Sequence, residues 1–357
     1  MTKESPCFFL GANGPKGFYS KFDQLFNYKE GCRCVLLKGG PGTGKSTVLK
    51  KMAAVLNQKG LSTELIYCTA DTDSLDAVIT EDGRFCALDA TLPHAVEPKY
   101  PGAYEETLNL SDCWNSGVLK EKTEKIICLF DRNRALHAKA RKYIAAAGEL
   151  LEEAAQLSLE TLISEKIAHT AGRICAKEFG KKRRFPGKEK LRFLSAITDK
   201  GVFVFENTPK LICDKIYVLE DDCGAASRIF MNTVRRIALD HGLDIITCRC
   251  GIFPGEKNEH IFIPELRLGF MTSNRRHPVT AQPYRVIHAR RFIDGKQAGL
   301  HKLRIKFSLR TAAELIREAA DCMREVKIVH DSLEREYSAA MDFDFLNKKT
   351  ESFLSTV

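Results

Sequence analysis

The sequence predicts a tandem duplicated α/β fold, in which each of two domains has a mostly parallel sheet and an appended long helical segment. Three observations support this prediction. The chain has 357 residues, which is enough for about two domains of ordinary size. Short apolar runs alternate with helical patterns, as in α/β domains. Similar segments also recur at a nearly constant distance along the chain, which indicates an internal repeat.

The repeat consists of segments that correspond at an offset of about 180 residues. In both copies a Phe-Leu pair opens the repeat, and apolar runs with the length of strands follow in the same order. The matched segments are Phe9–Phe18 with Phe193–Val202, Cys34–Leu37 with Ile216–Leu219, Leu65–Cys68 with Ile245–Cys248, and the runs from Phe85 and Leu268 that precede His94 and His277.

Each copy ends in a predicted helical segment. Residues 119–179 and 308–337 are rich in Ala, Leu, Glu and Lys, with apolar residues at three- and four-residue steps. Gly148 or Gly172 marks a candidate turn or a tolerated break in the first segment. The basic segment 180–188 is broken by Gly and Pro, which is typical of a solvated linker. We therefore expect a first domain over residues 1–180, a linker over 181–191 and a second domain over 192–357.

The composition favours a globular protein of the cytoplasm. Hydrophobic residues make up 44% and charged residues 28%, which argues against disorder. No apolar run approaches the ~20 residues of a membrane helix, and the first residues lack a secretory pattern. The 13 cysteines are then expected as reduced thiols. The net charge of +9 is weak evidence for a nucleic-acid partner, although the basic linker leaves that alternative open.

The segment Lys38–Thr47 carries the strongest functional signal. It satisfies the pattern G-x-x-x-x-G-K-[ST], with a β-type run before it and an amphipathic helical pattern after it. Glycines allow the tight turn that aims backbone N–H groups at phosphates, and the helix N-terminus adds its positive dipole end. Lys45 is expected at the β- and γ-phosphates and Ser46 at Mg²⁺. The expected ligands are ATP and Mg²⁺, and the expected binding residues are Gly39, Gly40, Pro41, Gly42, Thr43, Gly44, Lys45, Ser46 and Thr47.

The second copy has lost this motif. At the same point it carries Glu220–Arg228, and we expect Gly224 to match Gly42. The other expected matches are Asp221 with Gly39, Ala226 with Gly44, Ser227 with Lys45, and Arg228 with Ser46. Carboxylates then face the place where phosphates would bind, at a cost on the order of 1–4 kcal/mol for each close like-charge contact. The second copy is predicted to be an inactive site, with an anion bound by Arg228 as the alternative.

A Mg²⁺-orienting carboxylate is expected at the end of another strand. Asp89 and Asp131 both follow apolar runs, and the neighbours of Asp131 have a helical pattern, so we favour Asp89 as a metal ligand and catalytic residue. The residue after Asp89 is alanine, so this position does not supply a base for water. Asp71 is a third catalytic candidate, because its loop follows a strand at the nucleotide crevice. The alternative is that Asp73 or Ser74 caps a helix through Ile79.

Two further groups have both a functional and a structural interpretation. His94 is a candidate γ-phosphate sensor or acid–base group, and otherwise a structural histidine. The arginines of the second copy are candidate arginine fingers across the domain interface, and otherwise solvated surface residues. They are Arg275, Arg276, Arg290 and Arg291.

Taken together, these segments resemble a bacterial two-repeat P-loop NTPase family whose members are known only as ATPases or hypothetical proteins. The resemblance covers nearly the whole chain and is carried by Gly11–Phe18, Lys38–Thr47, Asp71–Asp76, Pro93–His94 and Pro98–Gly102. The wording of the phosphate loop is also similar to RecA/KaiC-type ATPases, but only locally. In that family the second repeat often keeps a complete phosphate loop, which this chain does not.

The expected function is Mg²⁺-dependent ATP hydrolysis at the first repeat. One alternative is a small-molecule or nucleotide kinase, in which the Asp71–Asp76 loop holds the acceptor. Another is a non-catalytic ATP-sensing scaffold whose helices and basic linker bind a protein partner. ADP formation without an acceptor distinguishes hydrolysis from both.

Overall fold

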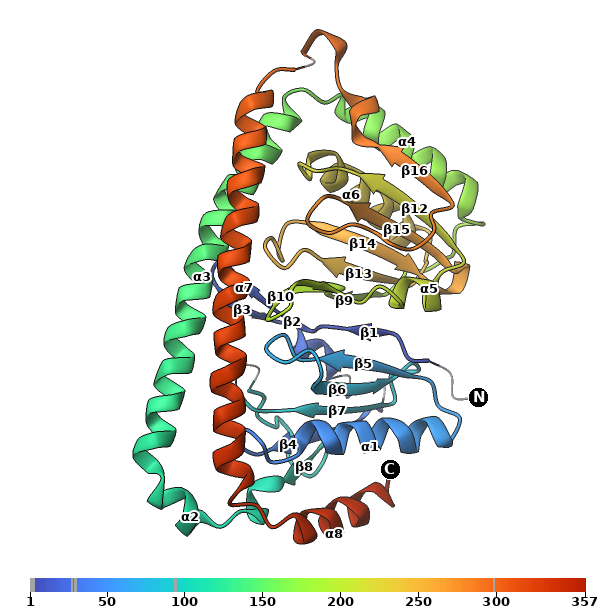
Figure 1. Cartoon of the computed structure of the whole chain (residues 1–357). Coiled ribbons are helices and arrows are strands. Elements are labelled where there is room, and N and C mark those ends of the chain that lie inside the picture. The colour runs from blue at the N-terminus through green and yellow to red at the C-terminus, as the bar shows by residue number, and fades with distance from the viewer. Residues whose placement is uncertain (1–3, 27, 29–30, 93–94, 298) are drawn as a thin grey trace.

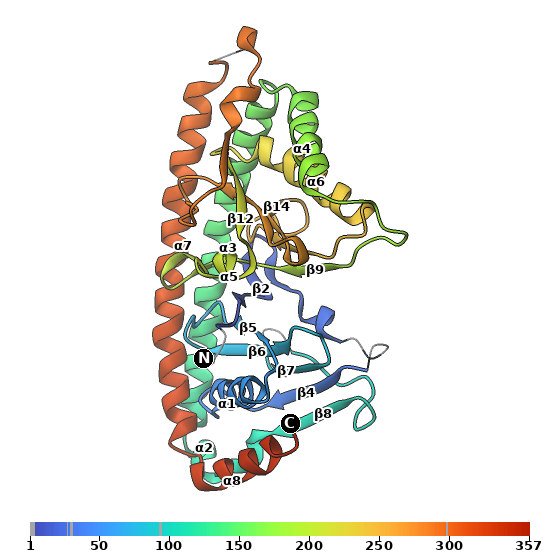
Figure 2. The ribbon, with the colours of Figure 1, turned by 90° about the vertical axis from the view of Figure 1, so that its right-hand side faces the viewer.

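The computed structural model describes residues 4–26, 28, 31–92, 95–297 and 299–357. Two six-stranded sheets lie one above the other beside a pair of long helices (Figure 1). In the view turned by 90°, both long helices run along the same side of the two sheets (Figure 2). Within the described ranges, every helix is too short or too polar to span a lipid bilayer.

The first sheet has the strand order β1-β5-β6-β7-β4-β8. β4 is parallel to β7 and β8, whereas β6 is antiparallel to both of its neighbours, so the sheet is mixed. A two-stranded hairpin, β2 with β3, precedes β4. The elements of this repeat are β1 (Cys7–Phe8), β2 (Gly11–Gly14), β3 (Gly17–Ser20), β4 (Arg33–Lys38), α1 (Lys45–Gln58), β5 (Thr63–Tyr67), β6 (Leu75–Thr80), β7 (Phe85–Asp89) and β8 (Glu105–Asn109).

The second sheet repeats this topology. From the equivalent edge its order is β9-β13-β14-β15-β12-β16, with β12 parallel to β15 and β16 and with β14 antiparallel to its neighbours. The predicted tandem duplicated α/β fold is therefore confirmed. Its elements are β9 (Glu189–Arg192), β10 (Ser195–Thr198), β11 (Gly201–Val204), α5 (Thr208–Ile212), β12 (Lys215–Glu220), α6 (Ala225–Asp240), β13 (Ile245–Arg249), β14 (Asn258–Ile263), β15 (Leu268–Ser273) and β16 (Arg285–His288).

The repeats meet at their equivalent edges. Phe9 and Phe193, which are matched positions of the repeat, exchange backbone hydrogen bonds of 2.9 Å in both directions. Beside them, Arg192 of β9 forms a buried ion pair with Glu64 of β5. One cluster of buried apolar side chains draws on both repeats, including Ile66 of the first and Phe262 of the second. Because the core is shared, the two repeats pack as a single unit.

The helical segments are exchanged between the repeats. The long helices α3 (Thr123–Leu159) and α7 (Lys302–Ser338) lie antiparallel, since Lys122 pairs with Glu336 at one end and His301 with Glu160 at the other. After α3, α4 (Ser164–Glu178) packs on α6 of the second repeat. After α7, α8 (Phe343–Leu354) packs beside α1 of the first repeat, and a short helix, α2 (Ser116–Glu121), precedes α3. The helix α4 follows the first repeat in the sequence but covers the second, and α8 follows the second repeat but covers the first.

Two local expectations were wrong. Neither Gly148 nor Gly172 marks a turn, because they lie inside α3 and α4, and the chain turns between these helices at residues 160–163. Gly148 is instead a close-packing position, where a Cβ would lie 3.4 Å from Ile252. Residues 75–80 form the strand β6 and not a helix capped by Asp73 or Ser74. This strand lies between β5 and β7 and is buried throughout, so it lacks a half-buried strand's alternating pattern.

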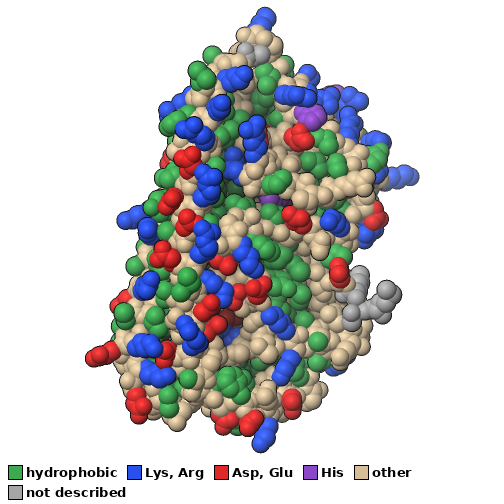
Figure 3. Space-filling model, in the orientation of Figure 1, with side chains coloured by type: hydrophobic (Ala, Val, Ile, Leu, Met, Phe, Trp, Pro, Cys, Tyr) green, Lys and Arg blue, Asp and Glu red, His purple; other side chains and the backbone are tan. Residues whose placement is uncertain are grey.

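Charged side chains are mixed on the face formed by the long helices. Figure 3 shows Lys and Arg interspersed with Asp and Glu along this face. In the basic segment, Arg183 pairs with Glu265, and β9 begins at Glu189. A mixture of both signs is not the one-sided basic face that is typical of nucleic-acid binding. The division into residues 1–180, 181–191 and 192–357 stays a prediction about the sequence, since the packed units exchange their helices.

Candidate functional site

The site is built around the loop between β4 and α1. Gly42 and Gly44 have φ values of +67° and +85°, which glycine adopts without strain. Gly44 N-caps α1, so the loop amides gather where the positive end of the helix dipole lies. Thr43 is fully buried, and its hydroxyl donates a 2.9 Å hydrogen bond to the carbonyl of Gly40, which fixes the turn. The predicted strand, loop and helix are present in this order.

Lys45 and Asp89 come together at the mouth of this loop. The ammonium group of Lys45 donates to the carbonyls of Gly39 and Gly40, at 3.0 and 2.7 Å, and lies 3.6 Å from a carboxylate oxygen of Asp89. Asp89 ends β7, which pairs directly with β4, so sheet register places it beside the loop. The hydroxyl and the backbone N–H of Thr91 donate to its other carboxylate oxygen and fix its orientation. Asp131, the rival candidate, lies on α3 and pairs with Arg134.

Ser46 and Asp71 lie on the side of the loop that faces β6. The backbone N–H of Leu75 donates to the hydroxyl oxygen of Ser46 at 2.9 Å. Asp71 accepts hydrogen bonds from the N–H of Asp73 at 3.1 Å and from the hydroxyl of Ser74 at 2.9 Å. Burial would raise the pKa of Asp71, but these bonds and the ammonium of Lys327 outweigh it and lower the pKa below its usual value. Asp71 is therefore ionised at neutral pH and is a weak base.

Helix α7, which follows the second repeat, lies directly on this loop. The hydroxyl of Ser338 donates to the carbonyl of Gly42 at 3.0 Å. A Cβ on Gly42 would lie 2.5 Å from the backbone oxygen of Glu334, and one on Gly40 would lie 2.8 Å from the ring of Tyr337. These two glycines thus permit the close approach of α7 in addition to the turn itself. The sequence gives no local signal for this contact, because it depends on how the long helices are exchanged.

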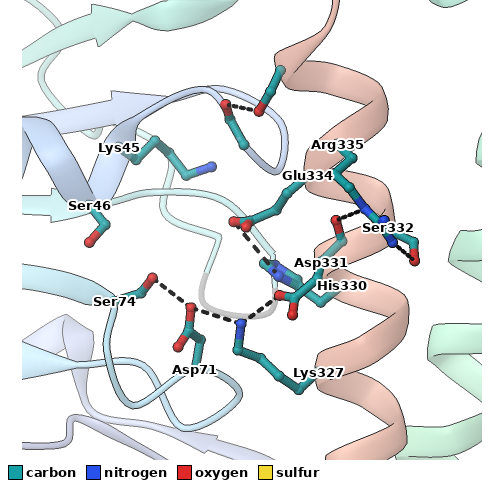
Figure 4. Close-up of polar contacts among 12 residues, drawn as sticks. Lys45, Ser46, Asp71, Ser74, Lys327, His330, Asp331, Ser332, Glu334 and Arg335 are labelled. Atoms are coloured by element: carbon teal, nitrogen blue, oxygen red, sulfur yellow. Dashed lines mark hydrogen bonds and ion pairs between the residues drawn. The ribbon is translucent and has the colours of Figure 1, made fainter.

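The same helix brings charged side chains toward the loop (Figure 4). The ammonium of Lys327 lies 3.5 Å from Asp71 and 2.5 Å from Asp331. Burial would lower the pKa of Lys327, but the two carboxylates raise it, so the side chain stays cationic. Potential ligand atoms of His330, Asp331 and Glu334 lie within 4.8 Å of one another. Figure 4 shows Glu334 extending from α7 toward Lys45. Sequence reasoning missed all four residues.

The second loop differs from its predicted alignment. Six residues, 39–44, separate β4 from α1, but only four, 221–224, separate β12 from α6. Gly224 has a φ of +83° and N-caps α6, so it corresponds to Gly44 and not to Gly42. The shorter loop places Ala225 where Lys45 stands and makes the matches proposed for Ala226, Ser227 and Arg228 wrong. The match of Asp221 with Gly39 is retained, because both residues directly follow the matched strands.

The carboxylate of Asp221 lies at the start of α6 in this second loop. It accepts hydrogen bonds from the backbone N–H groups of Gly224 at 3.0 Å and Ser227 at 2.8 Å. The side chain is buried, with 5% of the residue exposed. Because these are the N–H groups at the start of α6, the carboxylate satisfies donors that a helix leaves free. The loop is thus occupied by its own chain.

The remaining candidates lie elsewhere. His94 is outside the described residues. Arg275 pairs with Asp222, and Arg276 donates to the carbonyl of Asp222, so both contact the second loop instead of reaching the first as arginine fingers. Arg290 and Arg291 lie in a short 3-10 helix beside α4, where Lys166 donates to the carbonyl of Arg291.

Comparison with known proteins supports one part of this site. The family model of the AAA domain (dynein-related subfamily) matches residues 34–79, from β4 into β6. The match supports a P-loop NTPase, and with it nucleotide binding as the general function of this class. It ends before Asp89 and the long helices. No curated protein and no solved structure matches the chain.

Proposed function

We propose that the first repeat binds ATP with Mg²⁺ and hydrolyses the γ-phosphate. The observation that carries this proposal is the placement of Lys45 and Asp89, 3.6 Å apart, at the start of α1. Gly39 carries no side chain, whereas its counterpart Asp221 places a carboxylate against two N–H groups of the second loop, and this difference favours an external phosphate at the first loop. The loop amides of residues 39–47 would hold the phosphates, and Lys45 would exchange the carbonyls of Gly39 and Gly40 for phosphate oxygens.

The hard oxygen donors of Ser46 and Asp89 suit Mg²⁺, which would neutralise charge on the transferred phosphoryl group. Lys45 and the loop amides would stabilise the same charge, and most of the rate enhancement of phosphoryl transfer comes from such electrostatic stabilisation. Asp71 has a lowered pKa and holds Lys327, so we assign it a positioning role and not that of a base. Glu334 extends toward Lys45 and is our candidate for orienting the attacking water.

Lys327 adds a cation from the other half of the chain. It lies on α7, is held by Asp71 and Asp331, and stays protonated. A cation supplied across an interface stabilises negative charge on the transferred group in the way that arginine fingers do. We propose this role for Lys327 in place of the arginines of the second repeat. The second repeat would then contribute to ATP turnover without binding nucleotide itself.

The proposal also includes the family and the cellular location of the protein. The two-repeat topology supports membership of the bacterial P-loop family that the sequence resembles. All 13 cysteines are free, which supports a cytoplasmic location.

The test is ATP turnover by the wild type, Lys45→Ala and Lys59→Ala, measured as ADP formed with and without candidate acceptors. Lys59 is exposed beyond the other end of α1 and serves as the matched control. Acceptor-free turnover that Lys45→Ala reduces by about 100-fold or more and Lys59→Ala retains would support hydrolysis. ADP formed only with an acceptor would indicate a kinase, and tight ATP binding without turnover would indicate a sensing scaffold. Equal turnover by both variants would contradict the assignment of this loop.

A further inference from the structure

A cavity of about 80 Å³ lies beside the second loop. It is bounded by Cys223 and Gly224 of that loop, by β14, and by the long helices through Leu151 and Ile316. This volume exceeds the space that one water needs, so the cavity admits a ligand of a few non-hydrogen atoms. Because the cavity lies beside the matched loop, it is the counterpart of the first repeat's site. The N–H groups that would bind phosphate there already donate to Asp221.

The cavity has polar groups that are themselves buried. Lys257 and Glu259, 6% and 5% exposed, form an ion pair of 2.9 Å in its wall. The Lys257 ammonium lies 3.4 Å from the place of a Cβ on Gly224, which puts this cation at the second loop. His277 is 5% exposed, and its Nε2 has no hydrogen-bond partner among the described residues. A buried nitrogen without a partner is unfavourable, so a ligand that formed a hydrogen bond to it would be stabilised.

One cation of the wall, Arg276, has no carboxylate partner among the described residues. Three cations, Arg228, Lys257 and Arg276, line the cavity with one carboxylate, Glu259. Glu152 of α3 pairs with Arg228 from outside the cavity, and Glu259 pairs with Lys257. Asp221 of the second loop adds a buried carboxylate near Lys257. Arg276 donates to the backbone carbonyl of Asp222 and lacks a carboxylate partner in the described part of the chain, so Arg276 is the cation that would bind an anion.

The rest of the wall is apolar. Ile197 and Val202 of the β10–β11 hairpin, together with Leu151 and Ile316 of the long helices, form this side. Apolar walls with a few convergent polar groups are typical of sites for small organic molecules. An inorganic ion would leave this side without a partner, whereas a short hydrocarbon body would bury it.

We propose that the second repeat binds a small organic anion in this cavity, with its carboxylate or phosphate group at Arg276 and His277 and its apolar body against Ile197 and Ile316. The second repeat is then a separate ligand site whose chemistry has diverged from nucleotide binding. This proposal does not depend on ATP hydrolysis by the first repeat.

The test is calorimetric titration of the full chain with three probes: isovalerate, isobutyl phosphate and inorganic phosphate. We expect at least one organic probe to bind with a millimolar or lower Kd and more tightly than inorganic phosphate, because only the organic probes fill the apolar side. Arg276→Gln should weaken that binding by about 10-fold or more. Arg275→Gln is the matched control, since the side chain of Arg275 is 91% exposed and does not line the cavity.

Two further variants locate the binding. Ile316→Phe adds bulk to the cavity and should abolish binding without changing charge, which also covers the case in which Arg276→Gln folds poorly. Lys45→Ala should leave binding unchanged, because it alters only the first loop. The proposal is overturned if no organic probe binds with a Kd below about 10 mM. It is also overturned if Arg275→Gln and Arg276→Gln bind equally, or if Lys45→Ala removes the signal.

Discussion

The two loops that follow β4 and β12 share a backbone scaffold. They differ in the groups that lie at the N-terminus of the following helix. Both lead from a buried strand to a helix that is N-capped by a glycine with positive φ, Gly44 or Gly224. The first loop has Gly39 and Lys45, two residues of the phosphate-binding pattern. The second is two residues shorter, four against six, and Asp221 accepts the hydrogen bonds of two helix N–H groups. An internal carboxylate can thus accept the hydrogen bonds of N–H groups at the start of a helix that follows such a loop.

Placing a carboxylate at the matching position of the first loop should have the largest effect, which is a loss of ATP affinity. Gly39→Asp places the matching residue of the second loop beside the phosphates, and we expect ATP affinity to fall by at least about 100-fold. Close like-charge repulsion of about 1–4 kcal/mol would act together with competition for the loop amides. Calorimetric titration with ATP and Mg²⁺ measures this change.

Gly39→Ala is the control for this transfer, because its Cβ would meet the hydroxyl of Thr43 at 2.5 Å without adding charge. If the Ala and Asp variants bound ATP equally, steric crowding would explain the loss and the electrostatic comparison of the loops would fail.

Removing the cation that α7 brings to the first loop should have the next largest effect. Lys327→Ala is expected to lower kcat by about 100-fold with little change in ATP affinity, because the cation acts on charge that develops during transfer. Lys327→Arg keeps the charge and should retain more of the rate. Steady-state kinetics separate kcat from KM, and an unchanged kcat in Lys327→Ala would show that the second repeat supplies no catalytic cation.

Removing the internal carboxylate of the second loop should have the smallest effect, which is a modest loss of stability. Asp221→Ala leaves two N–H groups of α6 without their acceptor, so the free energy of unfolding should fall by about 1–2 kcal/mol. ATP turnover should persist, since the first loop is unaltered. Denaturant unfolding measures the loss.

The neighbouring Asp222→Ala is the matched control for this loss. Asp222 pairs with the Arg275 side chain, which is 91% exposed, and accepts an exposed hydrogen bond from the backbone N–H of Arg275. Exposed ion pairs of this kind contribute about 0–1 kcal/mol. Equal losses in the two variants would mean that Asp221 does not stabilise the second loop by capping α6.

The sequence predicted the features that are encoded locally or by repetition. Gly39–Ser46 identified the loop, and the repeat identified both sheets. The strand preceding Asp89 pairs with β4, which brings this residue to Lys45 as sheet register dictates. The α7 contacts were missed, because Lys327 is distant in sequence and reaches the loop only through helix exchange. The alignment of Gly224 failed because a two-residue deletion inside a degenerate loop leaves no motif to align.

The backbone pairing of Phe9 with Phe193 has a consequence for the origin of this asymmetry. A residue that bonds to its own counterpart lies on a two-fold axis, which is the signature of an isologous dimer. The chain therefore has the geometry of a homodimer whose subunits have been joined end to end. In a dimer of identical chains, every substitution alters both loops at once. Once the subunits are joined in one chain, the two loops can change independently. One loop can then lose its lysine while the other keeps it.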